Sequence, residues 1–263
     1  MKYYVVDAFT KDIFKGNPAG VCIVSEFPDT AFMQNIAYEN NLSETAFVVP
    51  RDGYFDLKWF TPELEIDLCG HATLASAYVI HHFFDQGLTE MNFHTLSGIL
   101  KVVKKDDLFE LNFPARIPEK IDSFSLIEEI LGGDPEELYV TRNQTGTRYY
   151  AVLENEERIA HFIPDFELIK KLPDSFGLVI TAKGKQSDFV SRFFAPHAGV
   201  DEDPVTGSVH CTLIPYWAGI LEKDKLLAKQ LSKRGGILYC ENLGARVAIG
   251  GHAVLYLEGS LNV

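Results

Sequence analysis

Two short motifs place polar side chains at the start of an apolar run. CGHAT (69–73) opens an uncharged stretch, and TGSVH (206–210) opens a second, mostly apolar one. If both stretches are helices, their first turns carry unpaired N–H groups and the positive end of the helix dipole, which together bind small anions. Gly70 and Gly207 would let a ligand approach that backbone closely. The motifs therefore predict a site for a small anionic metabolite, against the alternative that each glycine only packs its helix.

Four polar side chains could carry the chemistry. His71 opens the first helix, and the helix N-terminus is expected to lower the pKa of its imidazole and keep it neutral. Asp203 and Ser208 flank the second helix start, where either could serve as a cap and the Ser208 hydroxyl could reach a ligand. Glu44 stands at the mouth of an apolar strand. Partial desolvation there would favour its protonated form and suit it to general acid/base catalysis, whereas a solvated loop glutamate is the structural alternative.

The chain lacks the sequence patterns of common metal and nucleotide sites. It contains no H-E-x-x-H, G-x-G-x-x-G, Walker or G-x-S-x-G motif, and its four cysteines form no C-x-x-C pair. The other candidate metal ligands, His197 and His210, show no ligand spacing with His71 or Asp203. We therefore expect neither a metal nor a cofactor, and the scattered cysteines favour a reducing, cytoplasmic location.

Length and charge restrict the remaining function classes. The 263 residues suffice for two domains, and a hydrophobic content of 46% excludes a disordered chain. With 24 basic and 37 acidic residues, the net charge of −13 disfavours binding to nucleic acids and anionic membranes. No stretch reaches the roughly 18 apolar residues of a membrane span, and residues 2–9 indicate a strand rather than a signal peptide.

Short strands dominate the chain. Residues 30–41 indicate a helix capped by Asp29 or Thr30, and residues 125–132 indicate another that ends at a glycine pair. Runs rich in Val, Phe and Tyr predict strands at 2–9, 19–24, 45–50, 54–60, 91–96, 98–103, 108–113, 148–153, 176–181, 189–195, 237–240, 245–251 and 253–259.

The chain contains a weak internal duplication. Segments 59–78 and 193–216 both run from Phe-x-Pro through an acidic loop and a glycine into an apolar helix. These helices, 70–84 and 207–220, are apolar on nearly every face, as is typical of buried helices, and Pro215 should kink or end the second one. The duplication predicts two similar domains, each with a curled sheet around its own central helix.

Four motifs in order give the chain a resemblance to the PhzF family of phenazine-biosynthesis-like proteins. They are VDAFT…FKGNPAGV (6–21), NLSETAFVV (41–49), WFTP…EIDLCGHATLASA (59–77) and DEDPVTGSVHC (201–211). The resemblance implies an α+β, diaminopimelate-epimerase-like fold with two pseudo-symmetric domains and an active site in the cleft between them. We expect the domains at residues 1–115, with the last strand at about 252–263 added, and at residues 118–251.

The resemblance also implies an activity and a homodimer. The family's named reaction is a cofactor-independent isomerisation, in which one glutamate moves a proton across the ring of a dihydro-hydroxyanthranilate. By motif, that glutamate is Glu44, and His71, Asp203 and Ser208 are the other catalytic groups. The substrate-binding residues that it assigns are Gly70, Gly207, Asn17, Gly20 and Gly146.

Two other functions stay open. Related epimerases and racemases of this fold use one cysteine at each helix start. Cys69 occupies the first start, whereas residues 206–209 hold no cysteine and Cys211 comes half a turn late. A two-thiol racemase is therefore disfavoured, and a one-cysteine epimerase that pairs Cys69 with Glu44 remains. The other alternative is a protein that binds a small metabolite without converting it, although such a protein has no need of the glutamate.

Overall fold

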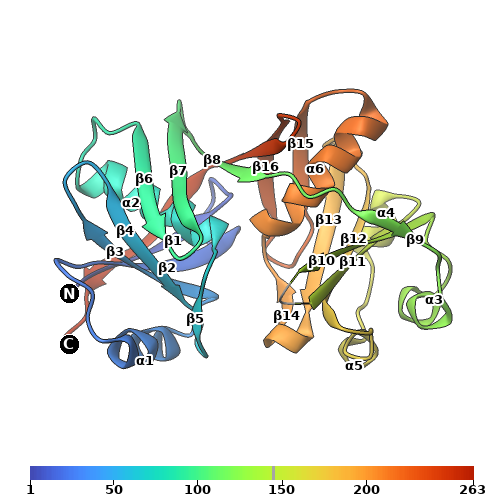
Figure 1. The fold of residues 1–263 in the computed structure, drawn as a ribbon, viewed down its shortest axis with the longest axis horizontal. Coiled ribbons are helices and arrows are strands. Elements are labelled where there is room, and N and C mark those ends of the chain that lie inside the picture. Colours follow the sequence, from blue (N-terminus) through green and yellow to red (C-terminus); the bar gives the residue numbers. More distant parts are fainter. Residues whose placement is uncertain (144–145) are drawn as a thin grey trace. The chain divides into compact units, whose positions relative to one another are not determined.

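The computed structural model describes residues 1–143 and 146–263 and divides the chain into two compact units (Figure 1). Unit 1 comprises Met1–Phe113 and Ala248–Val263, and unit 2 comprises Pro114–Val247. Each unit combines a mixed sheet with one long apolar helix, so each is an α+β structure with its own core.

The sheet of unit 1 follows the order β18, β1, β2, β3, β4, β6, β7, β8, with β5 beside β4. These neighbours are antiparallel except for β2–β3 and β4–β6, which are parallel. The strands are β1 (Lys2–Ala8), β2 (Asn17–Ile23), β3 (Glu44–Pro50), β4 (Phe55–Phe60), β5 (Glu65–Ile66), β6 (Glu90–Thr95), β7 (Gly98–Lys105), β8 (Leu108–Pro114) and β18 (Ala253–Ser260).

Helix α2 (Gly70–Phe83) is the central helix of unit 1. It packs against β1, β2 and β3 and also against β7 and β18, so strands that are far apart in the sheet order contact the same helix. The sheet therefore curls around α2, and Figure 1 shows the helix among the strands of this sheet. Most α2 residues between His71 and Ile80 are buried, which explains why the sequence has no Asp, Glu, Lys or Arg there.

Helix α1 (Thr30–Asn40) packs on the other side of the unit 1 sheet through a cluster that includes Met33 and Phe47. The Asp29 carboxylate caps it by accepting a hydrogen bond from the Phe32 backbone N–H at 2.9 Å. Its C-cap, Asn41, adopts the left-handed conformation at φ 48°. The sequence prediction of this helix and of its Asp29 cap is confirmed.

The sheet of unit 2 follows the order β9, β10, β11, β12, β13, β15, β16, with β14 beside β13. Its parallel pairs are β11–β12 and β13–β15. The strands are β9 (Glu119–Ile121), β10 (Glu137–Asn143), β11 (Gly146–Val152), β12 (Ser175–Lys183), β13 (Phe189–Ala195), β14 (Val200–Asp203), β15 (Lys225–Gln230), β16 (Gly236–Asn242) and β17 (Arg246–Gly251), which runs on into unit 1. The helices are α3 (Ser125–Leu131), α4 (Glu156–Ala160), α5 (Phe166–Ile169), α6 (Gly207–Leu221) and the 3₁₀ turn η1 (Pro196–Ala198).

The internal duplication is confirmed by strand pairing within each unit. In unit 1, α2 follows β4 and its short partner β5 and leads to β6, which is parallel to β4. In unit 2, α6 follows β13 and its short partner β14 and leads to β15, which is parallel to β13. The two units therefore share one topology, although few residues are identical.

The sequence predicts that Pro215 kinks helix α6 or ends it, and the second of these alternatives is wrong. The helix continues from Gly207 to Leu221. Proline lacks the N–H that would bond to the carbonyl of Cys211 one turn earlier. That carbonyl instead accepts a hydrogen bond from the Arg116 backbone N–H at 2.9 Å. The helix tolerates the proline because a neighbouring segment supplies the missing donor.

Among residues 1–143 and 146–263, no helix is long and apolar enough to cross a membrane.

Several elements were not predicted from the sequence, namely β5, β9, β10, β14, β15, α4 and α5. Most of them are too short for a hydrophobic period to emerge.

Candidate active site

Glu44 is the first residue of β3, at the point where the chain leaves α1 and enters the sheet. The parallel β2–β3 ladder pairs it with Ala19. Its side chain is only 16% exposed. Of the two alternatives that the sequence left open, a partly desolvated carboxylate and a solvated loop glutamate, the structure therefore shows the first.

His71 is the second residue of α2 and is buried. The residue before the helix, Cys69, has an extended backbone, and its side chain does not cap the helix. A β-carbon at Gly70 would make only ordinary contact with the Phe113 ring, at 3.5 Å, so packing does not require glycine there. The start of α2 thus has no side-chain cap and a small residue at its first position, as an anion site needs.

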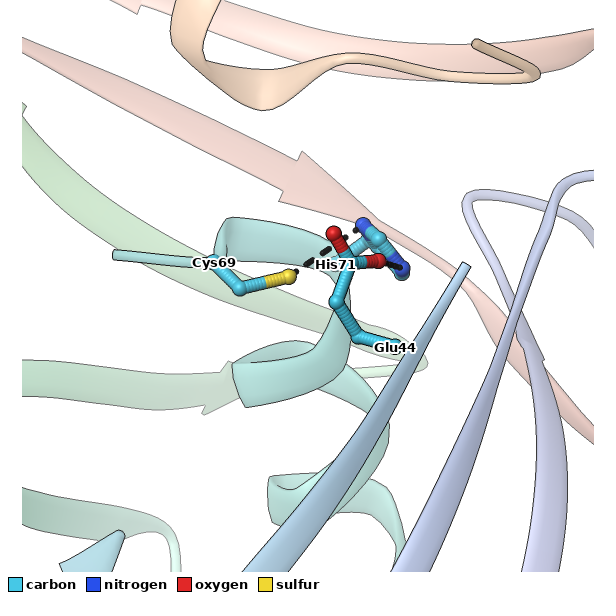
Figure 2. A group of neighbouring side chains, drawn as sticks. All are labelled: Glu44, Cys69 and His71. Atoms are coloured by element: carbon cyan, nitrogen blue, oxygen red, sulfur yellow. Dashed lines mark hydrogen bonds and ion pairs between the residues drawn. The ribbon is translucent and has the colours of Figure 1, made fainter. Parts of the chain in front are cut away.

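The imidazole of His71 contacts residues from three segments, and Figure 2 shows two of them, Glu44 and Cys69. Its Nε2 lies 2.9 Å from Oε2 of Glu44, and the two form an ion pair. Its Nδ1 lies 3.5 Å from Sγ of Cys69 and 3.3 Å from Nδ2 of Asn17. Neither Nε2 nor Oε2 has an aligned hydrogen-bond partner among the described residues, so the contact is chiefly electrostatic.

The charge state of His71 differs from the sequence prediction. Burial by itself lowers the pKa of His71, but the negative charges of Cys69 and Glu44, together with the hydrogen bond to Cys69, outweigh it and raise the pKa well above 6.5. Burial raises the pKa of the Cys69 thiol, and the Glu44 charge raises it further. Because a thiol with a raised pKa is neutral at pH 7, we attribute the His71 charge mainly to Glu44. The expectation of a neutral His71 is therefore wrong.

The amide of Asn17 suits either protonation state of His71. Its oxygen and nitrogen are nearly isosteric, so a turn of the amide presents an acceptor where the nitrogen now faces Nδ1. A charged imidazole would donate to the oxygen, and a neutral one would accept from the nitrogen. The surroundings of His71 can therefore accommodate a change of charge on the ring.

The donor atoms of Glu44, Cys69 and His71 lie within 4.8 Å of one another, close enough to be considered as metal ligands. However, Cys69 faces Nδ1 and Glu44 faces Nε2. One imidazole nitrogen binds one metal ion, so these contacts do not converge on a single ion. They are instead typical of a carboxylate–imidazole–thiol chain, in which the imidazole links an acid and a thiol.

Asp203 and Ser208 belong to unit 2 and are described within it. Asp203 does not cap α6, because Thr206 is the N-cap residue, so that expectation is wrong. The Asp203 Oδ2 accepts a hydrogen bond from Thr206 Oγ1 at 2.5 Å, and its backbone oxygen accepts one from Gln230 Nε2 at 2.7 Å. Ser208 is half-buried in the first turn of α6. Their catalytic roles stay predictions.

The predicted substrate-binding glycines differ in their surroundings. A β-carbon at Gly207 would meet nothing within 4 Å, which leaves the start of α6 open. At Gly20 it would lie 2.9 Å from the Tyr3 hydroxyl, and at Gly146, with φ +122°, it would lie 2.7 Å from the Asp174 backbone oxygen. Gly20 and Gly146 thus have packing and backbone reasons to be glycine, and their contacts with substrate stay predictions.

A hydrogen-bond network between Gln230 and Thr206 at the start of α6 was not predicted from the sequence. Gln230 accepts from the Thr206 backbone N–H at 2.9 Å, and its amide lies 3.2 Å from the Thr206 hydroxyl. Gln230 is fully buried at the end of β15. A lone glutamine distant from the motif carries no local signal of this role, because only the tertiary fold brings β15 to the helix start.

Comparison with known proteins agrees with this fold. The family model of the phenazine biosynthesis-like proteins matches residues 6–259. A Pseudomonas aeruginosa protein named as an uncharacterized isomerase is 45% identical over 100% of this chain and 99% of its own. A crystal structure of a PhzF-family protein from Enterococcus faecalis has a TM-score of 0.95 at 45% identity and covers 100% of both chains.

A more distant structure agrees in fold alone. A hydroxyproline epimerase from Agrobacterium vitis has a TM-score of 0.63 at 11% identity over 98% of this chain and 91% of its own. The α+β, epimerase-like fold implied by the four motifs is confirmed. By the family match and the identity to its relatives along its whole length, this chain belongs to the PhzF family of phenazine biosynthesis-like proteins.

Proposed function

We propose that this chain is a PhzF-type isomerase that moves a proton on a small carboxylated, cyclic and unsaturated metabolite without a cofactor. The observation that carries the proposal is the contact of 2.9 Å between Glu44 and His71 at the uncapped start of α2. A largely buried carboxylate beside an imidazole is well suited to general acid/base catalysis. The reaction class is also that of the P. aeruginosa relative named as an isomerase.

In the proposed reaction, Glu44 removes a proton from one substrate carbon and returns it to another. A C–H bond breaks as an O–H bond forms on the carboxylate, and the second half of the reaction reverses this exchange. No electrons are gained or lost overall. While Glu44 holds the proton, the charge of His71 is uncompensated, so it can stabilise the negative charge that develops on the substrate.

The substrate class follows from the helix starts. In a protein of net charge −13, a carboxylate ligand needs local donors that act against the overall field. The open backbone at Gly70, and in unit 2 at Gly207, provides such donors without lysine. Asp203 and Ser208 remain the predicted groups for orienting the substrate, as carried over from the family motif.

The decisive experiment compares wild-type protein with the Glu44→Gln variant by proton NMR in D₂O. The probes are a dihydro-hydroxyanthranilate and a panel of small carboxylated metabolites. We expect isomerisation or deuterium incorporation by the wild type and a loss of about a hundredfold or more in the variant. Glu63→Gln, which removes the same charge from an exposed loop, is the matched control and should behave as wild type. Turnover retained by a folded Glu44→Gln variant would refute the proposal.

The same experiment distinguishes the non-catalytic alternative. A protein that only binds a metabolite would broaden the ligand signals without exchanging hydrogen with solvent.

We further propose that the enzyme is a cytoplasmic homodimer. Its cysteines are free thiols, as expected in a reducing environment, and the family resemblance implies that two copies associate.

A specific contact favours one second candidate, a one-cysteine epimerase. Sγ of Cys69 lies 3.5 Å from Nδ1 of His71, so the charged imidazole could stabilise a thiolate there and make Cys69 a second acid/base group. Such an enzyme would remove a proton with one group and return it from the other to the opposite face of the same carbon. The Cys69 variants described below separate this candidate from the first.

A further inference from the structure

Arg148 of unit 2 is a buried cation that has no acidic partner within residues 1–143 and 146–263. It lies in β11, is only 8% exposed, and is the register partner of Thr141 in β10 and of Gly177 in β12. Its guanidinium stacks on the Phe176 ring at 4.3 Å. Its Nε has no hydrogen-bond acceptor among the described residues, and no carboxylate in the same set forms an ion pair with it. An ionised group buried in this way is unfavourable unless something pairs with it.

Arg192, two strands away in the same unit, shows how this fold satisfies an equally buried arginine. It is also 8% exposed, but its Nε and Nη2 lie 2.7 and 3.1 Å from the two carboxylate oxygens of Glu202. Its Nη1 donates to the backbone oxygens of Ile159 and Phe162. In a chain with 37 acidic and 24 basic residues, a shortage of acids does not explain why Arg148 lacks such a partner.

A second arginine stands near Arg148. The positive charge of Arg116 and the burial of Arg148 both lower the Arg148 pKa, with burial the larger cause. Both arginines also act on the thiol of Cys211, whose pKa is nevertheless raised to about 11 by burial. The Arg116 backbone is fixed by its hydrogen bond to the Cys211 carbonyl, which Pro215 leaves without a helical donor. The fold therefore holds two like charges close together.

Arg116 lines a cavity of about 500 Å³, together with residues that include Glu119, Thr141 and Arg142. The acid in this lining is already engaged, since Glu119 pairs with Arg142 at 2.5 Å. Thr141 lies directly across the β10–β11 ladder from Arg148, so the two side chains are on the same face of the sheet. A ligand in the cavity would therefore contact Arg116 and Thr141, and Thr141 is the cross-strand neighbour of Arg148.

We propose that Arg148 and Arg116 form an oxyanion site in unit 2 for a ligand that carries a carboxylate or phosphate group. The planar guanidinium, with its fixed fork of donors, matches a group with two or more oxygens on one atom. The site is built entirely from unit 2 residues and does not depend on the role proposed for Glu44.

The test measures thermal unfolding and calorimetric binding of the full-length chain with inorganic phosphate or succinate, against sodium chloride at equal ionic strength. We expect at least one probe to raise the wild-type Tm in a saturable way, and the preferred probe distinguishes a phosphate from a carboxylate site. Arg148→Met should weaken binding about tenfold or more. Arg51→Met is the matched control, because it removes the same charge from a residue of unit 1 that is paired with Asp56 and does not line the cavity, and it should bind as wild type.

Ligand-free stability gives a second, independent result. In sodium chloride, Arg148→Met should not have a lower Tm than the wild type, because it removes an unpaired buried charge, whereas Arg192→Met should have a clearly lower one. If Arg148→Met does not fold, Arg148→Lys keeps the charge without the fork and should still weaken binding. The proposal is overturned if neither probe binds the wild type, or if the Arg148 variants bind as tightly as the wild type.

Discussion

Glu44, Cys69 and His71 meet through the two nitrogens of a single imidazole. The proton on that ring is therefore shared between a carboxylate and a thiol, and the charge of each residue depends on the other two. His210 is also buried, and no acidic residue in the described part of the chain pairs with it. Burial lowers its pKa to about 4, although its Nδ1 is hydrogen-bonded to the Thr206 carbonyl. The carboxylate, rather than burial, thus decides the charge of His71.

This difference predicts distinct titrations of the two histidines. The ring signals of His71 should titrate well above pH 6.5 in the wild type, and in Glu44→Gln they should titrate at lower pH, because the charge that opposed burial is gone. His210 should remain neutral above about pH 5 in both proteins and serves as the internal reference. NMR titration of the histidine ring signals measures both, and a His71 titration unchanged in Glu44→Gln would show that Glu44 does not set its charge.

The raised pKa of His71 also determines how the stability of the protein changes with pH. The pKa of His71 is raised on folding. The contribution of its charge to the free energy of unfolding is therefore fully present below about pH 6.5 and is lost as the pH rises through the folded-state pKa. The free energy of unfolding of the wild type should therefore fall toward alkaline pH relative to His71→Gln. Urea unfolding at several pH values measures this difference.

Cys69 separates the two catalytic candidates at the residue scale. Its raised pKa makes the thiol a poor base at neutral pH, so Cys69→Ser should reduce proton exchange by less than about tenfold, as expected for one altered hydrogen bond. The D₂O exchange assay measures this, with Cys240→Ser, another buried thiol, as the control for effects on folding. A loss in Cys69→Ser as large as that in Glu44→Gln would favour the one-cysteine epimerase.

At the scale of elements, the starts of α2 and α6 are alike in lacking a side-chain cap. The other long helix, α1, is capped by Asp29 in the ordinary way. Leaving the first-turn N–H groups of a helix uncapped costs about 1 kcal/mol, so two uncapped starts in equivalent positions of the duplicated units fit ligand binding better than packing.

Helix α6 also yields a prediction about Pro215. A proline inside a helix ordinarily costs about 3 kcal/mol relative to alanine. Here the Cys211 carbonyl already accepts a hydrogen bond from Arg116, which Pro215→Ala would force it to share with a new donor. We therefore expect Pro215→Ala to raise the free energy of unfolding by less than about 1 kcal/mol. Urea unfolding measures this change. A gain close to the full difference between proline and alanine, about 3 kcal/mol, would mean that the hydrogen bond from Arg116 contributes little.

At the scale of the whole molecule, the proposed pairing of two copies can be measured directly. Phe14 and Tyr256 pack edge to face at 5.6 Å, and both are more than half exposed, as expected of apolar groups that a partner covers. Light scattering during gel filtration should give about twice the chain mass of 29.5 kDa. Tyr256→Glu should lower this value toward the single chain, with Tyr38→Glu, at a still more exposed tyrosine on α1, as control.

Local patterns in the sequence were sufficient for the elements that bear the family motifs. The caps of α1, the apolar length of α2 and α6, and the position of Glu44 at a strand mouth all depend on residues close in the chain. The duplicated Phe-x-Pro to glycine pattern likewise predicted two units of one topology. Composition and periodicity are local properties, so they can be read before any contact is known.

The tertiary structure alone decided the chemistry of individual side chains. The helix position of His71 predicts a neutral ring, but the parallel β2–β3 pairing and the packing of α2 on β3 bring the Glu44 carboxylate to within 2.9 Å and reverse that prediction. Arg148 and Arg192 look alike in the sequence. Only the fold gives Arg192 a carboxylate partner, whereas Arg148 has none among the residues that the structure describes. Electrostatic interactions act through space and depend strongly on burial, so neighbours along the chain do not determine them.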